Sequence, residues 1–240
     1  MHVDSLSIAH RFRGPPRSGN GGYVCGRIAD RLPGTVSVRL KAPPPLDTPL
    51  RLESADDAAR LLDAGDALIG EARSATLDLR PPAPPTYDEA VAASSGFLGF
   101  REHPFPRCFV CGPDRETGDG LRILPGAIGS DGVVAAPWLP DASLAGADGT
   151  VQREFLWAAL DCTSGFSQLP LPEGLSMVLG ELCATIDGTL RPGERCVVIG
   201  WPLAHEGRKR TAGSAVYGGD GRLVAHARAV WIEVPLADWR

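Results

Sequence analysis

The stretch FLWAALDCTSGF, residues 155–166, decides how the rest of the chain has to be arranged. It reads as one helix, and it offers almost no polar residue before Asp161. A helix at a protein surface shows polar residues along one side, so this one is expected to be buried. A carboxylate in such a helix, Asp161, therefore has to be explained. Asp161 is a structural acid that caps or pairs with an arginine, a helix-end residue that faces water, or a working group in a pocket.

The composition is that of an ordinary globular protein, and it restricts the class of partner. The chain has 240 residues, of which 43% are hydrophobic and 22% charged, with a net charge of −5. Nucleic acid is not expected as a partner, because a phosphate-binding face is strongly basic. No apolar run reaches the roughly 18 residues that span a bilayer, and residues 1–16 lack the apolar core of a signal peptide. We expect a cytoplasmic protein that does not associate with membranes.

Two halves of the chain have a similar pattern, and a proline-rich segment separates them. In that segment, RPPAPPTYDEAV (80–91), Thr86 and Glu89 form a capping box that predicts a short helix over about 87–95. Each half has one helix-like stretch, 22–32 in the first and 151–162 in the second, followed by strand-like segments. The strands are predicted over 35–42, 49–54, 59–64, 66–79, 176–187, 194–204, 209–218 and 221–234.

This pattern predicts an α+β fold in which antiparallel strands wrap an apolar helix, because little else can cover all of its faces. Two such units are expected: an N-terminal repeat over 1–85 and a C-terminal repeat over 105–240. The linker between them, 86–104, carries the short helix.

Three segments resemble proteins of the hotdog-fold thioesterase superfamily. CFVCGPDRETGDGLRI (108–123) resembles the CFGCG…GL segment before the first strand of many PaaI-like thioesterases. FLWAALDCTSGF resembles the superfamily's helix, in which an apolar run leads to an acid. GNGGYVCGRIAD (19–30) resembles a helix start in double-hotdog acyl-CoA thioesterases. The resemblance implies a double hotdog, in which each curved antiparallel sheet wraps a central helix. A homodimer of the chain is a further expectation.

The resemblance also implies a chemistry. An acyl-CoA, or another acyl thioester, would bind where the repeats meet and be hydrolysed there. Asp161 would activate water or attack the thioester directly, and both routes stay open. The N–H groups of Gly22 and Tyr23 would stabilise the oxyanion, since a helix N-terminus has unpaired donors. Asn20 and Gly21 would contact the substrate beside them. No cofactor is expected, because coenzyme A enters as part of the substrate.

Further residues are expected to bind the substrate. Trp157 and Ser164 lie on the same helix as Asp161 and would line the pocket. Arg208 and Lys209 belong to the densest basic cluster, which would hold the phosphates of coenzyme A or deter aggregation at a hairpin edge. A polar group follows the acid and would either line the pocket or end the helix: Thr163, Ser164, Ser167 and Gln168.

Six cysteines, mostly isolated, favour reduced thiols over a disulfide framework. Cys108 and Cys111 form a CxxC pair, which with His103 offers three zinc-type ligands, a redox pair or a structural turn. A fourth ligand would have to come from Cys162, Cys183 or Cys196 in space. The structural turn is our prediction, and no metal is expected.

The chain also departs from the family pattern. Asn20 stands where PaaI-like enzymes commonly carry histidine, and the last predicted strand, AHARAVWIEV (225–234), has no glutamine. The alternative function is therefore a non-catalytic acyl-CoA or lipid-binding protein. A dehydratase would need an Asp/His pair on a helix, and neither helix carries one.

Overall fold

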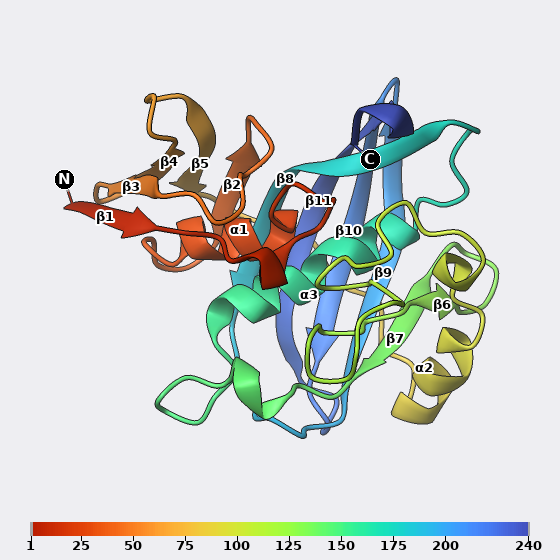
Figure 1. Ribbon diagram of the computed structural model, residues 1–240. Helices are drawn as coiled ribbons and strands as arrows, with labels where there is room; N and C mark the ends of the chain where they lie inside the picture. The colour runs from red at the N-terminus through yellow and green to blue at the C-terminus, as the bar shows by residue number, and fades with distance from the viewer. Residues whose placement is uncertain (1, 240) are drawn as a thin grey trace.

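The computed structural model describes residues 2–239, which form one 11-stranded sheet flanked by helices (Figure 1). The first half contains β1 (His2–Leu6), α1 (Gly21–Ala29), β2 (Val36–Leu40), β3 (Leu50–Ser54), β4 (Ala58–Leu62) and β5 (Leu68–Ser74). The second contains β6 (Gly126–Ala127), β7 (Val134–Trp138), α3 (Arg153–Phe166), β8 (Leu175–Ile186), β9 (Cys196–Glu206), β10 (Lys209–Tyr217) and β11 (Leu223–Pro235). Helix α2 (Tyr87–Ser94) lies between the halves in sequence, and short 3-10 helices cover His10–Phe12, Leu98–Phe100, Ala142–Leu144 and Leu236–Trp239.

Both halves of the sheet have the same strand order. The sheet runs β1-β3-β4-β5-β2-β8-β11-β10-β9-β7-β6. Read inward from each edge, the first half is β1-β3-β4-β5-β2, and β7-β9-β10-β11-β8 repeats that order, with β6 added outside. The halves meet where β2 pairs antiparallel with β8. In each half one helix is followed by four strands, α1 by β2 to β5 and α3 by β8 to β11, which confirms the predicted order.

Polar side chains reinforce the junction of the two halves. The carboxylate of Glu181 on β8 accepts hydrogen bonds from Ser37 Oγ (2.9 Å) and Arg39 Nε (2.7 Å) on β2. The hydroxyls of Thr35 and Thr185 lie 2.7 Å apart at the same junction. Because these partners come from both halves, they help to fix the register in which the sheet continues.

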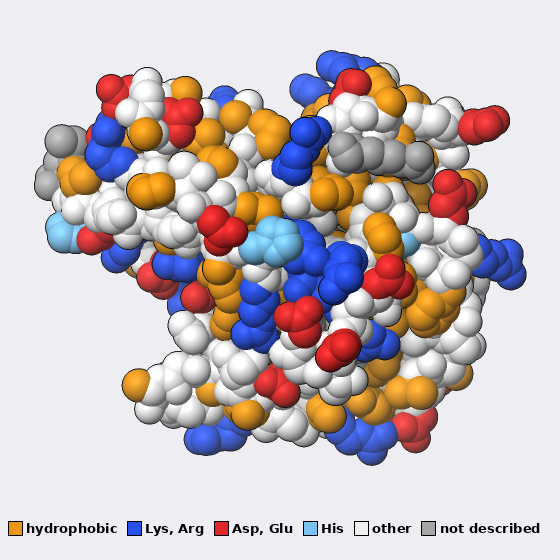
Figure 2. Space-filling view, viewed as in Figure 1, with side chains coloured by type: hydrophobic (Ala, Val, Ile, Leu, Met, Phe, Trp, Pro, Cys, Tyr) orange, Lys and Arg blue, Asp and Glu red, His pale blue; other side chains and the backbone are white. Residues whose placement is uncertain are grey.

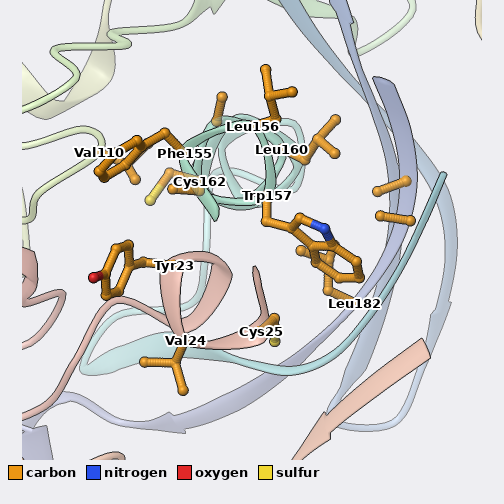
Figure 3. Packing of buried hydrophobic residues seen from close by; sticks show 14 of the residues in the cluster. Tyr23, Val24, Cys25, Val110, Phe155, Leu156, Trp157, Leu160, Cys162 and Leu182 are labelled. Atoms are coloured by element: carbon orange, nitrogen blue, oxygen red, sulfur yellow. The ribbon is translucent and has the colours of Figure 1, made fainter. Parts of the chain in front are cut away.

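Helices α1 and α3 lie against each other and against the same face of the sheet (Figure 1). Helix α3 contacts β7 to β11, and α1 contacts β2, β4, β5 and β8. Every residue from Phe155 to Gly165 is buried, which explains why this helix has no polar face. Figure 3 shows Phe155, Leu156, Trp157 and Leu160 leaving α3 in different directions into apolar surroundings.

Two glycines on α1 allow its close approach to α3. A Cβ at Gly22 would lie 2.5 Å from Asp161 Cβ and 2.7 Å from the Trp157 carbonyl oxygen. A Cβ at Gly26 would lie 2.6 Å from Glu154 Cα. Gly22 and Gly26 are four residues apart and so lie on one face of α1. That face packs backbone to backbone on α3, where a larger side chain does not fit.

Helix α2 covers the opposite face of the sheet near β7 and β9. Thr86 caps it, and the side chain of Glu89 accepts from the Thr86 N–H (2.7 Å), which confirms the predicted capping box. Ala90 is fully buried in a small cluster with residues of β7, β9 and β10. The linker helix is thus packed on the second half of the sheet.

The cysteines agree with the sequence prediction of reduced thiols. All six cysteines are free thiols and all are buried. Within residues 2–239, none of the helices has the length and apolar character required to cross a bilayer.

Candidate functional site

A cavity of about 270 Å³ lies where the two halves meet, and both contribute to its wall. The first half supplies the start of α1 and the loops around 15–20 and 40–44. The second supplies the later turns of α3, β8, β11 and the loop around 103–111. Much of the wall is apolar, and it includes Phe166, Leu169, Met177, Leu179, Trp231 and Ile232.

Among the described residues of this wall, Asp161 is the one with an acidic side chain, and it is only 2% exposed. Its Oδ2 accepts from the Gly22 N–H and from Asn20 Nδ2, each at 2.8 Å. Its Oδ1 is buried without a partner among residues 2–239. Asp161 therefore neither pairs with an arginine nor faces water. Its bond to the Gly22 N–H at the start of α1 is a capping contact, so the capping alternative stays open beside the working group in a pocket.

Burial changes the acidity of this carboxyl. Desolvation raises the pKa of Asp161 to about 7, and the nearby Cys108 raises it too, whereas the hydrogen bonds from Gly22 and Asn20 lower it. A carboxyl with a pKa near neutrality is suited to accept a proton from water and to return it. This agrees with the sequence prediction that the helix carrying Asp161 is buried.

Asn20 connects the two helices at the cavity. Its Oδ1 accepts from the Tyr23 N–H (2.9 Å) and so caps α1. Its Nδ2 donates to Asp161 and lies 3.8 Å from the sulfurs of both Cys108 and Cys162. Asn20 and Gly21 both line the cavity, as the sequence predicts for substrate contacts.

The two backbone N–H groups predicted to stabilise the oxyanion, those of Gly22 and Tyr23, both donate to side chains of the protein. The Tyr23 N–H donates to the Asn20 cap, and the Tyr23 side chain stacks on Phe12 in the core, so this N–H is not free for the oxyanion role predicted for it. The Gly22 N–H donates to Asp161 and is not free while that bond stands. Gly21 lines the cavity, and within the described chain its N–H, the first of α1, has no acceptor.

Two predicted substrate contacts are core residues. Trp157 is 2% exposed, lies under Gly26 of α1 and does not belong to the cavity wall (Figure 3). Ser164 is fully buried: its Oγ donates to the Asp161 carbonyl (2.6 Å) and accepts from Trp231 Nε1 (2.8 Å). Ser167 Oγ donates to the Ser164 carbonyl near the end of α3, and Gln168 Nε2 donates to the Thr211 carbonyl on β10. Ser164, Ser167 and Gln168 thus anchor the end of the helix, which was the alternative to lining the pocket, whereas the buried Thr163 hydroxyl has no partner among residues 2–239.

Ser164→Ala is expected to lower the free energy of unfolding by about 1–3 kcal/mol, the cost of leaving a buried donor unsatisfied. The stranded donor is the indole N–H of Trp231. Chemical denaturation measures the loss, and repeating it in a Trp231→Phe background supplies the control. Removal of the hydroxyl should cost clearly less there, and an equal loss in both backgrounds would contradict this role.

Arg208 and Lys209 are exposed at the turn between β9 and β10 and do not line the cavity. On the neighbouring strand β11, the residue paired with Lys209 is Ile232, which does line the cavity. Lys209 therefore lies one strand away from the cavity wall. Arg210 forms an ion pair with Glu233 (2.5 Å). Contact of Arg208 and Lys209 with a substrate stays a prediction.

A second basic group lies nearer to the cavity. Figure 2 shows Lys and Arg side chains gathered in the middle of one face, where loops cross in front of α3 in Figure 1. Burial lowers the pKa of Arg13, and the charges of Arg115 and Arg107 lower it further. The backbone of Arg13 forms an isolated β-bridge with Gly19, and Arg107 is the residue before Cys108. Gly19 and Cys108 both line the cavity, so these two arginines lie beside its wall. We call Arg13, Arg107 and Arg115 the arginine cluster.

Sequence reasoning missed much of the wall. The residues of β8 and β11 in the wall gave no signal, because alternation in a strand does not say which face meets a cavity. The CxxC pair was predicted to be a structural turn, with a zinc site or a redox pair as alternatives, and Cys162 was one of three cysteines named as a possible further ligand. Cys108, Cys111, Cys162 and His103 all line the cavity.

Comparisons with known proteins identify the fold. In sequence, neither a family model nor a curated protein matches the chain. A TesB protein of Mycobacterium avium subspecies paratuberculosis is similar in structure, with a TM-score of 0.60 and 12% identity over 97% of this chain and 93% of that one. A candidate thioesterase II from Thermobifida fusca has a TM-score of 0.60 and 13% identity over 98% and 93%. A conserved protein with a hot dog fold from Alicyclobacillus acidocaldarius has a TM-score of 0.57 and 9% identity over 97% and 93%. The chain therefore has the hotdog fold.

Proposed function

We propose that the chain is a double-hotdog protein that hydrolyses an acyl thioester, such as an acyl-CoA, in the cavity between its halves. The proposal rests on the buried carboxylate of Asp161, which lies in the cavity wall and accepts a hydrogen bond from the Gly22 N–H at the start of α1. The Thermobifida protein is a candidate thioesterase, which supports the same reaction class.

The double repeat rests on the matching strand orders of the two halves and on the antiparallel pairing of the equivalent strands β2 and β8. We propose repeats over 1–85 and 105–240, each with its sheet wrapped around one helix, joined by the linker 86–104. Two repeats in one chain place the start of α1 against α3, as two subunits of a dimer would.

Chemically, the thioester carbonyl carbon has to meet an oxygen nucleophile. With Asp161 as general base, water adds to the carbonyl carbon, its proton passes to the carboxylate, and the C–S bond breaks to release the thiol and the acid. With Asp161 as nucleophile, its carboxylate oxygen bonds to the carbonyl carbon, the C–S bond breaks to release the thiolate, and water then cleaves the resulting anhydride to give the acid and restore the carboxylate. Both routes need a donor for the oxyanion, and the free N–H of Gly21 is the candidate. The Gly22 N–H becomes a donor only if Asp161 Oδ2 turns away from it.

The surroundings support an acyl thioester with an anionic carrier. The apolar part of the wall suits an acyl chain. Outside it, the exposed Arg107 and the half-buried Arg13 of the arginine cluster offer guanidinium donors for phosphates such as those of coenzyme A. Arg115 is buried and donates to Asp119 and to the carbonyls of Arg11 and Arg107. Arg208 and Lys209 are a second basic group that would serve the same purpose.

The second candidate function is binding of an acyl-CoA or lipid without hydrolysis. The hydrogen bonds that occupy Asp161 Oδ2 favour it, because they hold the carboxylate against α1.

Release of free thiol from short, medium, long and aromatic acyl-CoAs, followed with a thiol reagent, separates the two functions. Turnover of at least one substrate supports hydrolysis. Quenching of the wall tryptophans Trp231 and Trp239 by an acyl-CoA without thiol release supports the binding protein.

A further inference from the structure

Three buried thiols from two distant segments meet in the cavity wall. The sulfurs of Cys108, Cys111 and Cys162 all lie within 4.8 Å of one another. Cys108 and Cys111 belong to the loop after the linker, and Cys162 belongs to α3. The CxxC pair thus has a third partner that its own spacing does not provide.

The separation of the sulfurs fits ligands around one ion. Zinc–sulfur bonds of about 2.3 Å at tetrahedral angles place two sulfurs about 3.8 Å apart. The sulfurs of Cys108 and Cys162 lie 3.7 Å apart. A disulfide needs sulfurs about 2.0 Å apart, so these two sulfurs are not bonded covalently, and their separation matches that of two thiolates on one ion.

The polar groups around the thiols are also suited to a cation that carries a bound water, because they include an N–H donor near the sulfurs and two buried polar atoms without partners among residues 2–239. Asn20 Nδ2 lies 3.8 Å from the sulfurs of Cys108 and Cys162, where its N–H groups offset negative charge on thiolates. Asp161 Oδ1 and His103 Nε2 are buried without partners among residues 2–239, and both residues line the same cavity.

His103 is better suited to a supporting role than to ligation. Its Nδ1 accepts from the Phe105 N–H (2.9 Å), so the neutral ring carries its proton on Nε2. That nitrogen is then a donor. Ligation by Asp161 would leave three thiolates and a carboxylate around a divalent ion, a net charge of −2 in a buried site, which is costly.

We propose that Cys108, Cys111 and Cys162 bind one Zn²⁺ ion as thiolates, with the fourth coordination position facing the cavity. Thiolates select zinc among the common divalent ions, and three protein ligands with an open position are a known zinc arrangement. Binding releases the thiol protons to solvent. The ion would tie the Cys108–Cys111 loop to α3 next to Asp161, whether or not the chain hydrolyses thioesters.

Titration of the chelator-stripped, reduced full-length protein with Co²⁺ tests this proposal. We expect one Co²⁺ per chain, with the near-ultraviolet charge-transfer band of cobalt–thiolate bonds, and displacement of Co²⁺ by Zn²⁺. Cys162→Ser and Cys108→Ser should weaken binding by more than about 100-fold, the upper end of the loss when an outer-shell partner is removed. Cys196→Ser is the matched control, because its sulfur contacts the Glu194 carbonyl (3.4 Å), a bond that serine can keep.

Several results would overturn the proposal. Wild-type protein that takes up no stoichiometric Co²⁺, or takes it up without the thiolate band, contradicts it even if a variant fails to fold. Equal binding by Cys162→Ser and Cys196→Ser does so too, as does a disulfide that leaves four free thiols in the unfolded, unreduced chain. Asp161→Asn should retain the metal, so loss of hydrolysis and loss of metal are separate outcomes.

Discussion

Asp161→Asn is expected to lower the turnover of the best acyl-CoA substrate by about 10²–10⁴-fold, the usual contribution of a positioned general base. The amide has the same shape, and its oxygen can still accept from the Gly22 N–H, but it cannot take a proton from water. The measurement is kcat for thiol release, compared with Asp30→Asn, which changes an exposed acid at the other end of α1. Full activity in Asp161→Asn would remove this residue from the mechanism.

The same variant should not lose stability. Burial raises the pKa of Asp161 to about 7, so the folded state favours the neutral carboxyl and stability falls as pH rises from the unfolded pKa through 7. At pH 8 the wild-type protein holds a buried charge that asparagine lacks. Thermal unfolding at pH 8 should show a melting temperature for Asp161→Asn at least equal to that of wild type. A lower one would mean that loss of activity reports misfolding.

Gly22→Ala is expected to lower the free energy of unfolding by about 3 kcal/mol, the upper end of the usual cost of overpacking a core. The new methyl would meet Asp161 Cβ at 2.5 Å and the Trp157 carbonyl at 2.7 Å. Both belong to the α3 segment that α1 packs on, so the helices have to separate. The melting temperature should fall by roughly 6–12 °C for a chain of this size.

Gly65→Ala is the matched control for that variant. Its added methyl would have Asp63 Oδ1 at 3.4 Å as nearest neighbour, and its φ is not positive. A glycine-to-alanine change at such a position alters stability by less than about 1 kcal/mol. Gly22→Ala with wild-type stability would mean that α1 and α3 do not approach as closely as described.

The sequence predicted the elements of the fold well because their signals are local. The apolar run 155–166, the alternating strands and the capping box at Thr86 each depend on neighbouring residues, and all are found in the structure. The burial of the helix that carries Asp161 followed from the same run, whereas exposure of Asp161 to water was one of the alternatives left open.

The site was predicted less well because its contacts join residues far apart in sequence. Gly22 was given the role of receiving a substrate, yet it meets Asp161 on the other helix. Trp157 and Ser164 lie on a helix buried on every side, and no pattern says which of its faces meets a cavity. The third thiol beside the CxxC pair comes from α3, and only the packing of the loop on that helix brings it there.

A crystal structure of Asp161→Asn with a bound acyl-CoA would test most directly whether thioesters are hydrolysed beside Asp161. We predict the acyl chain in the cavity, with the thioester carbonyl carbon about 3–3.5 Å from the residue 161 side chain or from one water that it holds. The carbonyl oxygen should face the Gly21 N–H. An acyl group bound outside this cavity, or a thioester turned away while Gly22 and Asn20 still cover residue 161, would contradict it.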